Sequence, residues 1–171
     1  MIKPWLFEFL PELGGPSVEP DPRDVAALFA RYLDLWARDE ALGFEGIFFS
    51  EHHFARSYSA SPNLLIAAIA QRTKKLRLGV MGVVLPYYHP ARVVEEIGML
   101  DHLTGGRLEI GTAIGVPQEL SRLNITMAEA RERRSRDSLR PILHRCIGQI
   151  RSALGQRVGK RSNVGKPSGT I

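Results

Sequence analysis

Short apolar segments alternate with longer amphipathic ones along residues 1–111, and this alternation limits the folds that the chain can adopt. The expected strands occupy residues 2–9, 45–50, 76–85 and 107–111, and the expected helices lie between them. Short apolar runs bounded by Gly and Pro are typical of buried strands, whereas apolar residues at helical spacing indicate amphipathic helices. Strands that alternate with helices form parallel β-α units with right-handed connections. The sequence therefore predicts an α/β fold, either a barrel or an open doubly wound sheet.

Capping signals set the expected helix boundaries. Asp21-Pro22 predicts the N-cap and first residue of the first helix, and Ser61-Pro62 predicts the start of the second by the same logic. Pro90 predicts the start of the third helix. Glycine favours helix ends because it adopts left-handed backbone angles, so Gly43 and Gly105 predict the ends of the first and third helices.

The charge is distributed unevenly and divides the chain in two. Residues 1–130 hold 12 Lys and Arg against 16 Asp and Glu, a net −4, whereas residues 131–171 hold 11 against 2, a net +9. We predict a folded domain over 1–130 and a basic tail over 131–171, helical at first and then disordered. Nucleic-acid binding by this tail is disfavoured, because no aromatic residue follows residue 130 to stack on bases.

Composition excludes several other classes of protein. The single cysteine, Cys146, rules out an internal disulfide and a multi-cysteine metal site, and it suits a reducing compartment. The N-terminal residues lack the apolar core of a signal peptide, and no segment has the roughly 18 apolar residues that cross a membrane. These features predict a soluble, cytoplasmic protein.

The candidate catalytic residues are Glu51, His52 and His53, which follow the expected strand 45–50 directly. In barrels of alternating strands and helices, chemistry takes place at the carboxyl ends of the strands. Histidine is the side chain whose ordinary pKa lies closest to neutrality. No third ligand stands at metal-binding spacing, so a metal site is not expected. The alternative is that the histidine pair only caps or lines a loop.

Several short motifs follow one another in a fixed order: Glu51-His52-His53-Phe54, Ser61-Pro62-Asn63, Val83-Val84-Leu85-Pro86, His89-Pro90-Ala91-Arg92 and Gly105-Gly106-Arg107. Together they resemble the bacterial luciferase-like flavin-dependent monooxygenases over about residues 1–130. The resemblance implies a TIM (β/α)8 barrel, of which this chain holds only about the first four βα units.

The resemblance also implies an activity. Reduced FMN would react with O2 to a flavin C4a-hydroperoxide, which transfers oxygen to an organic substrate; in some branches of the family the deazaflavin F420 replaces FMN. A separate flavin reductase would supply the reduced flavin, because the sequence has no nicotinamide-binding fingerprint. The implied assembly is a homodimer formed through the second and third helices.

Residue roles follow from the same resemblance. His52 matches the catalytic histidine, and Glu51 and His53 match its active-site neighbours. Met81-Gly82, followed by Val83, aligns with a cis non-prolyl peptide that lies against the flavin ring.

A second candidate cofactor segment runs from Gly111 through Thr112 to Gly115. It resembles a phosphate-binding loop, but it lacks the Lys-Ser/Thr pair of a P-loop, so a tight turn is the alternative. Ile114 stands where luciferases carry an arginine near the flavin phosphate.

Members of the family are considerably longer than this chain, so we expect a truncated protein. Translation out of frame after Arg133 would explain the arginine-rich composition of the tail. Four strands leave a barrel open, with Phe48, Val80, Val83 and Ile110 expected on its interior face. Two alternatives therefore stay open: an active half barrel, and a non-catalytic remnant of such an enzyme.

Overall fold

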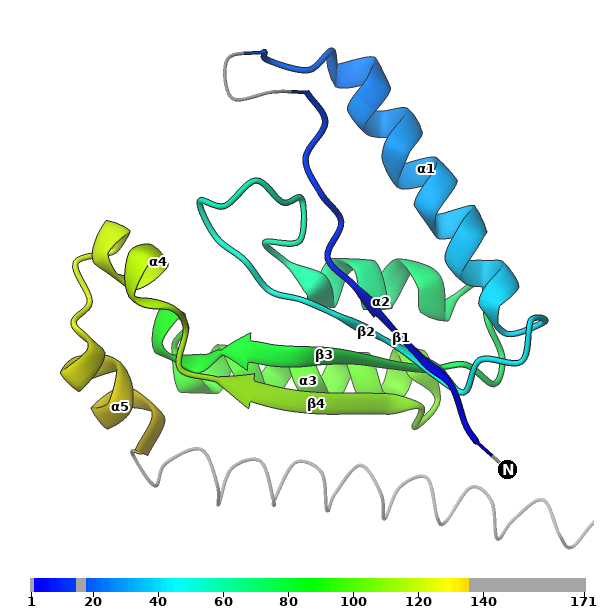
Figure 1. Cartoon of the computed structure of the whole chain (residues 1–171). Helices are drawn as coiled ribbons and strands as arrows, with labels where there is room; N and C mark the ends of the chain where they lie inside the picture. The colour runs from blue at the N-terminus through cyan, green and yellow to red at the C-terminus, as the bar shows by residue number, and fades with distance from the viewer. Residues whose placement is uncertain (1, 15–17, 136–171) are drawn as a thin grey trace, which may run out of the picture.

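The computed structural model describes residues 2–14 and 18–135 and confirms the predicted alternation of strands and helices (Figure 1). The elements are, in order, β1 (Trp5–Glu8), α1 (Pro22–Asp39), β2 (Gly46–Phe49), α2 (Pro62–Ala70), β3 (Arg77–Val84), the 3₁₀ turn η1 (Leu85–Tyr87), α3 (Pro90–Thr104), β4 (Leu108–Ala113), α4 (Pro117–Arg122) and α5 (Met127–Ser135).

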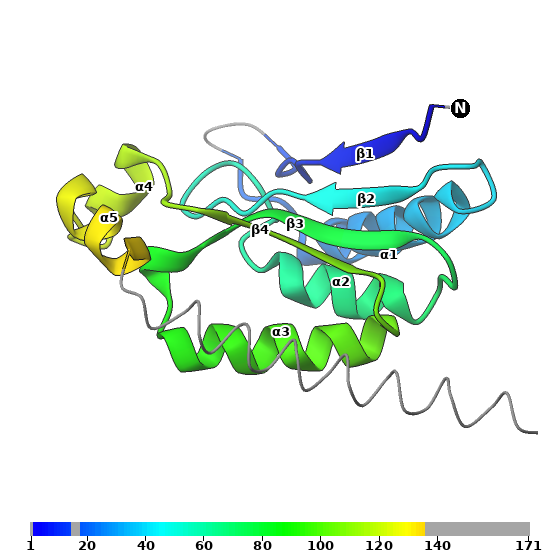
Figure 2. The same ribbon diagram turned by 90° about the horizontal axis from the view of Figure 1, so that it is seen from below.

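The strands form one parallel sheet in the order β1-β2-β3-β4. Helices α1, α2 and α3 all lie on the same face of this sheet, and the opposite face carries no helix among the described residues (Figure 2). A doubly wound sheet has helices on both faces, whereas a barrel wall has them only outside. The arrangement is therefore that of half a barrel wall.

The hydrophobic core lies between the sheet and the three helices. Its members are at most 8% exposed and include Trp36, Ile47, Phe49, Ile66, Ile69, Leu78, Val80, Val94 and Ile97. Because alternate residues of a strand point to opposite faces, Ile47 and Phe49 of β2 both face the helices.

The expected interior face is only partly correct. Phe48 does lie there, stacked on Trp5 with the ring centroids 4.8 Å apart. Val80 and Val83 belong instead to the core against the helices, and Ile110 packs on that core. Gly79 lies on the open face, because a Cβ atom there would come within 2.6 Å of the Phe48 ring.

Most predicted helix boundaries are confirmed. The Asp21 carboxylate accepts a hydrogen bond from the Arg23 backbone N–H at 2.8 Å, and Pro22 begins α1. Gly105 ends α3 with φ +65°. Helix α2 begins at Pro62, although Ser61 makes no side-chain capping bond. The end of α1 was predicted wrongly: the helix stops at Asp39, and Gly43, with φ +88°, lies in the turn that follows.

Glu40 ties the end of α1 to the loop between α2 and β3. One oxygen of its carboxylate accepts the backbone N–H groups of Lys74, Lys75 and Leu76 at 2.7–2.9 Å. These hydrogen bonds, with that of Lys75 the largest contribution, hold the pKa of Glu40 below its ordinary value. This carboxylate therefore fixes the position at which β3 enters the sheet.

Helix α5 runs across residue 130, where we expected a domain boundary. The predicted basic tail beyond residue 135 lies outside the described residues. Among the helices of residues 2–14 and 18–135, none combines the length and apolar character needed to cross a bilayer.

Replacing Glu40 should destabilise the sheet. Glu40→Ala leaves three backbone donors without their acceptor, which should lower the free energy of unfolding by about 1–3 kcal/mol in urea denaturation. Because the folded-state pKa is depressed, the contribution should be present above pH 4.5 and should disappear as the pH falls through the folded-state pKa. Glu95→Ala, at an exposed position of α3, is the matched control and should change stability by less than about 0.5 kcal/mol. Equal effects of the two substitutions would contradict this assignment.

Candidate functional site

Glu51 joins the carboxyl ends of β2 and β3. It follows β2 and is only 6% exposed. One carboxylate oxygen accepts the backbone N–H of Val84 at 3.1 Å, and the other accepts the hydroxyl of Tyr88 at 2.8 Å. Burial first, and the charge of Glu51 second, raise the pKa of Tyr88 far above its usual value, so this hydroxyl stays protonated. Glu51 is thus an anchor inside the protein rather than a group on its surface.

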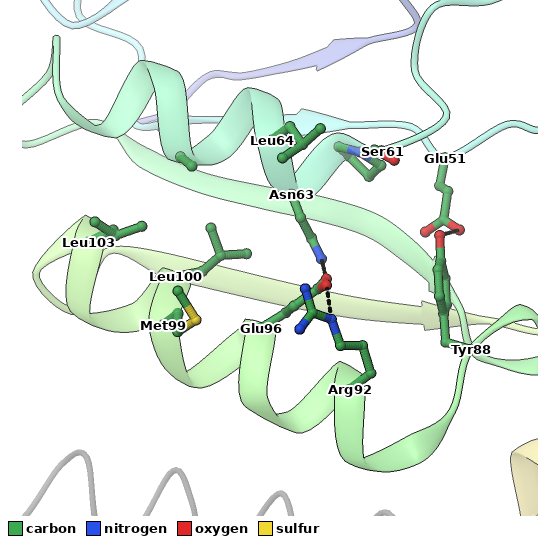
Figure 3. Close-up of a pocket in the computed structure, with 12 residues that line it drawn as sticks. Glu51, Ser61, Asn63, Leu64, Tyr88, Arg92, Glu96, Met99, Leu100 and Leu103 are labelled. Atoms are coloured by element: carbon green, nitrogen blue, oxygen red, sulfur yellow. Dashed lines mark hydrogen bonds and ion pairs between the residues drawn. The ribbon is translucent and has the colours of Figure 1, made fainter.

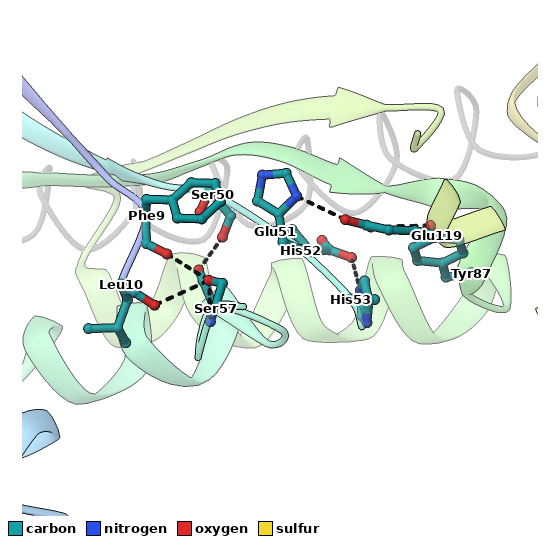
Figure 4. Close-up of polar contacts among 10 residues, drawn as sticks. Phe9, Leu10, Ser50, Glu51, His52, His53, Ser57, Tyr87 and Glu119 are labelled. Carbon is teal, nitrogen blue, oxygen red and sulfur yellow. Dashed lines mark hydrogen bonds and ion pairs between the residues drawn. The ribbon is translucent and has the colours of Figure 1, made fainter. Parts of the chain in front are cut away.

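His53 is held by the same carboxylate. Its Nε2 atom lies 2.9 Å from Oε1 of Glu51, and its ring meets the ring of Tyr87 edge-on at 4.8 Å (Figure 4). Both contacts fix the imidazole against the η1 turn. The side chain retains 20% exposure, so one edge of the ring still reaches solvent.

His52 has a different carboxylate partner. Its Nδ1 atom lies 3.0 Å from Oε1 of Glu119, a residue of α4 that is 6% exposed (Figure 4). A carboxylate accepts hydrogen bonds, so this pairing assigns the hydrogen of a neutral His52 to Nδ1 and leaves Nε2 as a proton acceptor. The Phe9 ring lies 4.7 Å away, between centroids, and shields one face of the imidazole. The side chain is 29% exposed.

Tyr87 completes this second arrangement. Its hydroxyl donates to Oε2 of Glu119 at 3.4 Å. Burial first, and then the charge of Glu119, raise the pKa of Tyr87 to about 12. The phenol therefore remains a donor at physiological pH. The site consists of two His-Glu-Tyr sets, His52-Glu119-Tyr87 and His53-Glu51-Tyr88, which touch where His53 meets Tyr87.

Glu119, Tyr87 and Tyr88 were not predicted as site residues from the sequence. Both tyrosines directly follow Pro86 in the segment after β3, at the same edge of the sheet as the histidines. Glu119 is the only acidic residue between positions 110 and 128. A single acidic residue shortly after a strand end was the available signal, but its pairing with His52 required the fold of the α4 segment.

The loop after β2 is fixed by hydroxyl groups. Ser57 Oγ donates to the Phe9 carbonyl at 2.7 Å, and Ser59 Oγ donates to the carbonyl of Ser50. The His52 backbone N–H donates to the Ser59 carbonyl at 3.2 Å. These bonds fold the loop back on β1 and set the direction in which the His52 side chain leaves the backbone.

The residues predicted to bind a cofactor fall into two groups. Met81, Gly82 and Gly111 lie together on neighbouring strands: the Met81-Gly82 peptide is cis, and a Cβ atom on Gly82 would come within 2.8 Å of the Gly111 carbonyl carbon. Met81 is 55% exposed on the open face. Thr112 continues β4 and is exposed.

Val83 and Gly115 are placed differently. The Val83 side chain is 3% exposed and points into the core against the helices, so only its backbone is near Met81. Gly115 has φ +84°, and a Cβ atom there would meet Val84 at 2.9 Å and the Tyr87 hydroxyl at 3.2 Å. Gly115 therefore packs beneath the 3₁₀ turn, and the adjacent Ile114 is half-buried.

A groove of about 360 Å³ lies between α2 and α3, on the outer side of the sheet (Figure 3). Asn63 donates to Glu96 at 3.0 Å, and Arg92 donates to the other oxygen of Glu96 at 2.7 Å. Apolar side chains continue the surface of the groove: Leu64 is 72%, Met99 64% and Leu103 46% exposed. Within residues 2–14 and 18–135, no group of three His, Cys, Asp or Glu side chains could hold a metal ion.

Comparison with known sequences gives a family match. The profile of a family described as luciferase-like monooxygenase matches residues 13–153, so the match continues past Arg133. The 4-hydroxyprotoasukamycin monooxygenase of Streptomyces nodosus subsp. asukaensis is 40% identical over 119 residues, which make up 68% of this chain and 32% of that protein. The chain spans about a third of the length of the curated relatives it matches.

Solved structures agree with the sequence match. The monooxygenase RslO1 from Streptomyces bottropensis superposes with a TM-score of 0.68 at 29% identity, over 84% of this chain and 42% of that one. The oxygenating constituent of 3,6-diketocamphane monooxygenase of Pseudomonas putida, solved with FMN, has a TM-score of 0.63 at 24% identity, over 78% of this chain and 37% of that one, and shares the fold. Because the family profile covers most of its length, this chain belongs to the luciferase-like monooxygenase family.

Proposed function

We propose that this chain carries the proton-handling part of a monooxygenase site that uses reduced FMN and O2 to oxygenate an organic substrate. The observation that supports this most directly is the pairing of His52 with the buried carboxylate of Glu119. It leaves Nε2 free to accept a proton at the carboxyl edge of the sheet, where barrel enzymes hold their substrates.

The residues around Met81 fit a flat heteroaromatic ring. Gly82 and Gly111 carry no side chain where β3 and β4 lie side by side, and Met81 projects beside them with 55% exposure. Met81, Gly82 and Gly111 would hold the ring of a flavin, and the backbone of Val83 and Thr112 borders it. The aliphatic side chain of Ile114 cannot form an ion pair with a phosphate. The segment from Gly111 to Gly115 would therefore contact the flavin ring rather than the flavin phosphate.

A bound reduced flavin supplies the electrons that activate O2 for transfer of one oxygen atom to the substrate. The protein residues manage the proton. His52 accepts or returns it at Nε2, and the Glu119 carboxylate stabilises the imidazolium that forms. Tyr87 holds Glu119 in place through its hydroxyl. Phe9 covers one face of His52 and limits the access of water on that side.

Two partners belong to the proposal. A separate reductase would deliver reduced flavin to this protein. A second copy would bind through the α2–α3 groove, where Leu64, Met99 and Leu103 expose apolar surface to solvent. Burial of such a patch is a common basis of protein association.

Removing the His52 imidazole should change the rate of flavin reoxidation while leaving the affinity for FMN nearly unchanged. We expect the wild-type chain to quench FMN fluorescence saturably and His52→Ala to bind FMN within about threefold of that affinity. Stopped-flow absorbance should show the reoxidation of the bound reduced flavin by O2 changed by about 100-fold or more, the range of general acid–base effects. His102→Ala, at an exposed site on α3, is the control and should change neither quantity.

The cofactor assignment fails if the wild-type chain shows no saturable FMN binding. Saturable binding of F420 in place of FMN would assign the site to the deazaflavin branch instead. If His52→Ala and His102→Ala reoxidise bound flavin at the same rate, His52 has no role in proton transfer.

Loss of the Glu119 carboxylate should slow the reaction more than loss of the Tyr87 hydroxyl that contacts this carboxylate. Glu119→Gln removes the negative charge that stabilises the imidazolium, and it should reduce the His52-dependent rate by about 10-fold or more, since a hydrogen bond to a charged group contributes about 1.5–3 kcal/mol. Tyr87→Phe removes only one 3.4 Å hydrogen bond and should have a smaller effect. Far-UV circular dichroism checks that each variant is folded, and a larger loss in Tyr87→Phe than in Glu119→Gln would contradict this ranking.

A further inference from the structure

We propose that Glu8, the last residue of β1, is a positioning residue for His52. Glu8 would act through Phe9, the next residue in the chain, whose ring lies against the imidazole (Figure 4). The inference rests on the proposed role of His52 in proton transfer, and it adds a residue on which that role depends. Its basis is a set of hydrogen bonds that fixes the backbone around Phe9.

The Glu8 carboxylate accepts three hydrogen bonds. Its Oε1 atom accepts the backbone N–H groups of Phe9 and Leu10 at 3.1 and 3.2 Å. Its Oε2 atom accepts the indole N–H of Trp36, a residue of α1 that is 1% exposed, at 3.0 Å. An ionised carboxylate has only acceptor positions, so it suits three converging donors. The buried indole therefore fixes the carboxylate, and the carboxylate fixes the backbone that follows β1.

This backbone turns sharply at Leu10. Leu10 has φ +46°, in the left-handed region that large side chains rarely adopt, and its side chain is 0% exposed. Such a conformation persists only where the surrounding contacts enforce it. Glu8 accepts the N–H of Leu10, and the Leu10 carbonyl accepts the backbone N–H of Tyr58 at 2.9 Å. Because both sides of the turn are held, the direction in which the Phe9 side chain leaves the backbone is fixed.

Phe9 connects this turn to the imidazole. The ring centroids of Phe9 and His52 are 4.7 Å apart, with an angle of 42° between the ring planes. Ser57, in the loop that also carries His52, donates to the Phe9 carbonyl at 2.7 Å. A displaced Phe9 ring would leave one face of the imidazole unsupported, and the imidazole could then rotate away from Glu119, which it contacts at 3.0 Å.

Glutamine cannot replace the carboxylate of Glu8. The amide in Glu8→Gln offers one acceptor oxygen in place of two, and its NH2 group would face a donor on the other side. Either the two backbone N–H groups or the Trp36 indole would lose their acceptor, and a buried donor without an acceptor is unfavourable. The side chain would therefore move, and the turn that holds Phe9 would loosen.

Proton NMR of the histidine rings in the flavin-free protein tests this role. An aromatic ring displaces the resonances of protons near its face, so the Hε1 and Hδ2 signals of His52 report on the position of the Phe9 ring. Phe9→Leu removes the aromatic ring at a position that is 42% exposed, and it defines the His52 signals without that ring. We expect Glu8→Gln to move the His52 signals toward these positions and to redistribute the Nδ1–H tautomer. In the Phe9→Leu background, Glu8→Gln should cause no further shift of the ring protons.

Glu45→Gln is the matched control. Glu45 precedes β2 and pairs with Lys3, ahead of β1, at 2.8 Å. Its carboxylate therefore also joins the β1 and β2 segments, but at the opposite end of the two strands. Glu45→Gln should leave the His52 signals at their wild-type positions.

Trp36→Phe supplies a second test if circular dichroism shows that Glu8→Gln is unfolded. It keeps an aromatic ring in the core and removes the indole donor that fixes Glu8. We expect the His52 signals to shift in the same direction as in Phe9→Leu, by a smaller amount. Signals that stay at their wild-type positions in folded Glu8→Gln, or in Trp36→Phe, would overturn the proposal. Equal shifts in Glu8→Gln and Glu45→Gln would overturn it as well.

This readout needs no flavin, so it can fail separately from the proposed function. A wild-type chain that does not bind FMN would contradict the proposed function, and the His52 signals would still decide the role of Glu8. With flavin bound, the reoxidation rate of Glu8→Gln should change in the same direction as that of His52→Ala, by about 10-fold, with an FMN affinity within about threefold of wild type, because misplaced catalytic groups lose rate rather than binding.

Discussion

The buried carboxylate of Glu51 is the contact on which the geometry of the site depends. It stands at the end of β2, and it accepts hydrogen bonds from the backbone of β3 and from Tyr88 beyond the 3₁₀ turn. A buried carboxylate is costly unless donors surround it. Here the donors come from segments more than thirty residues away, so satisfying this charge fixes the two strand ends relative to each other. The same carboxylate holds His53. Because His52 lies between Glu51 and His53 in the sequence, this contact also restricts the position of the His52 backbone.

The site separates two neighbouring histidines by giving each a different carboxylate. Glu51, which follows β2 directly, holds His53, whereas Glu119 contacts His52 from α4. Both tyrosines that support the carboxylates have a raised pKa and remain donors. The two imidazoles are therefore not equivalent. His53 is packed against Tyr87, and His52 lies at the boundary of the open face beside Phe9, which favours His52 as the group that exchanges a proton with a ligand.

Local chemistry made much of the fold predictable. The Asp21-Pro22 cap, the αL glycine at 105 and the apolar run of β3 act within a few residues, and each was confirmed. Predictions failed where the outcome depended on distant residues. Val80 was assigned to the interior because an uninterrupted apolar run does not show which alternate positions face the helices. In the structure Gly79 faces Phe48 on the open side of the sheet, so the alternate residue Val80 faces the helices. Glu51, His52 and His53 could be selected from their position after a strand, but Glu119 could not be assigned to His52 without the path of β4 and α4.

The comparison with relatives and the arrangement of the sheet agree that this chain corresponds to part of a barrel enzyme. The chain matches about a third of the length of its curated relatives, and its described residues form half a barrel wall with the site at one rim. The central claim is that Glu119 holds the hydrogen of His52 on Nδ1 and leaves Nε2 as the acceptor. Long-range ¹H–¹⁵N NMR of the histidine rings, with His52 assigned from a His52→Gln variant, measures this directly. We predict the Nδ1–H tautomer for His52 and its loss or redistribution in Glu119→Gln; an Nε2–H tautomer in the wild-type chain, or a spectrum that Glu119→Gln leaves unchanged, would contradict the claim.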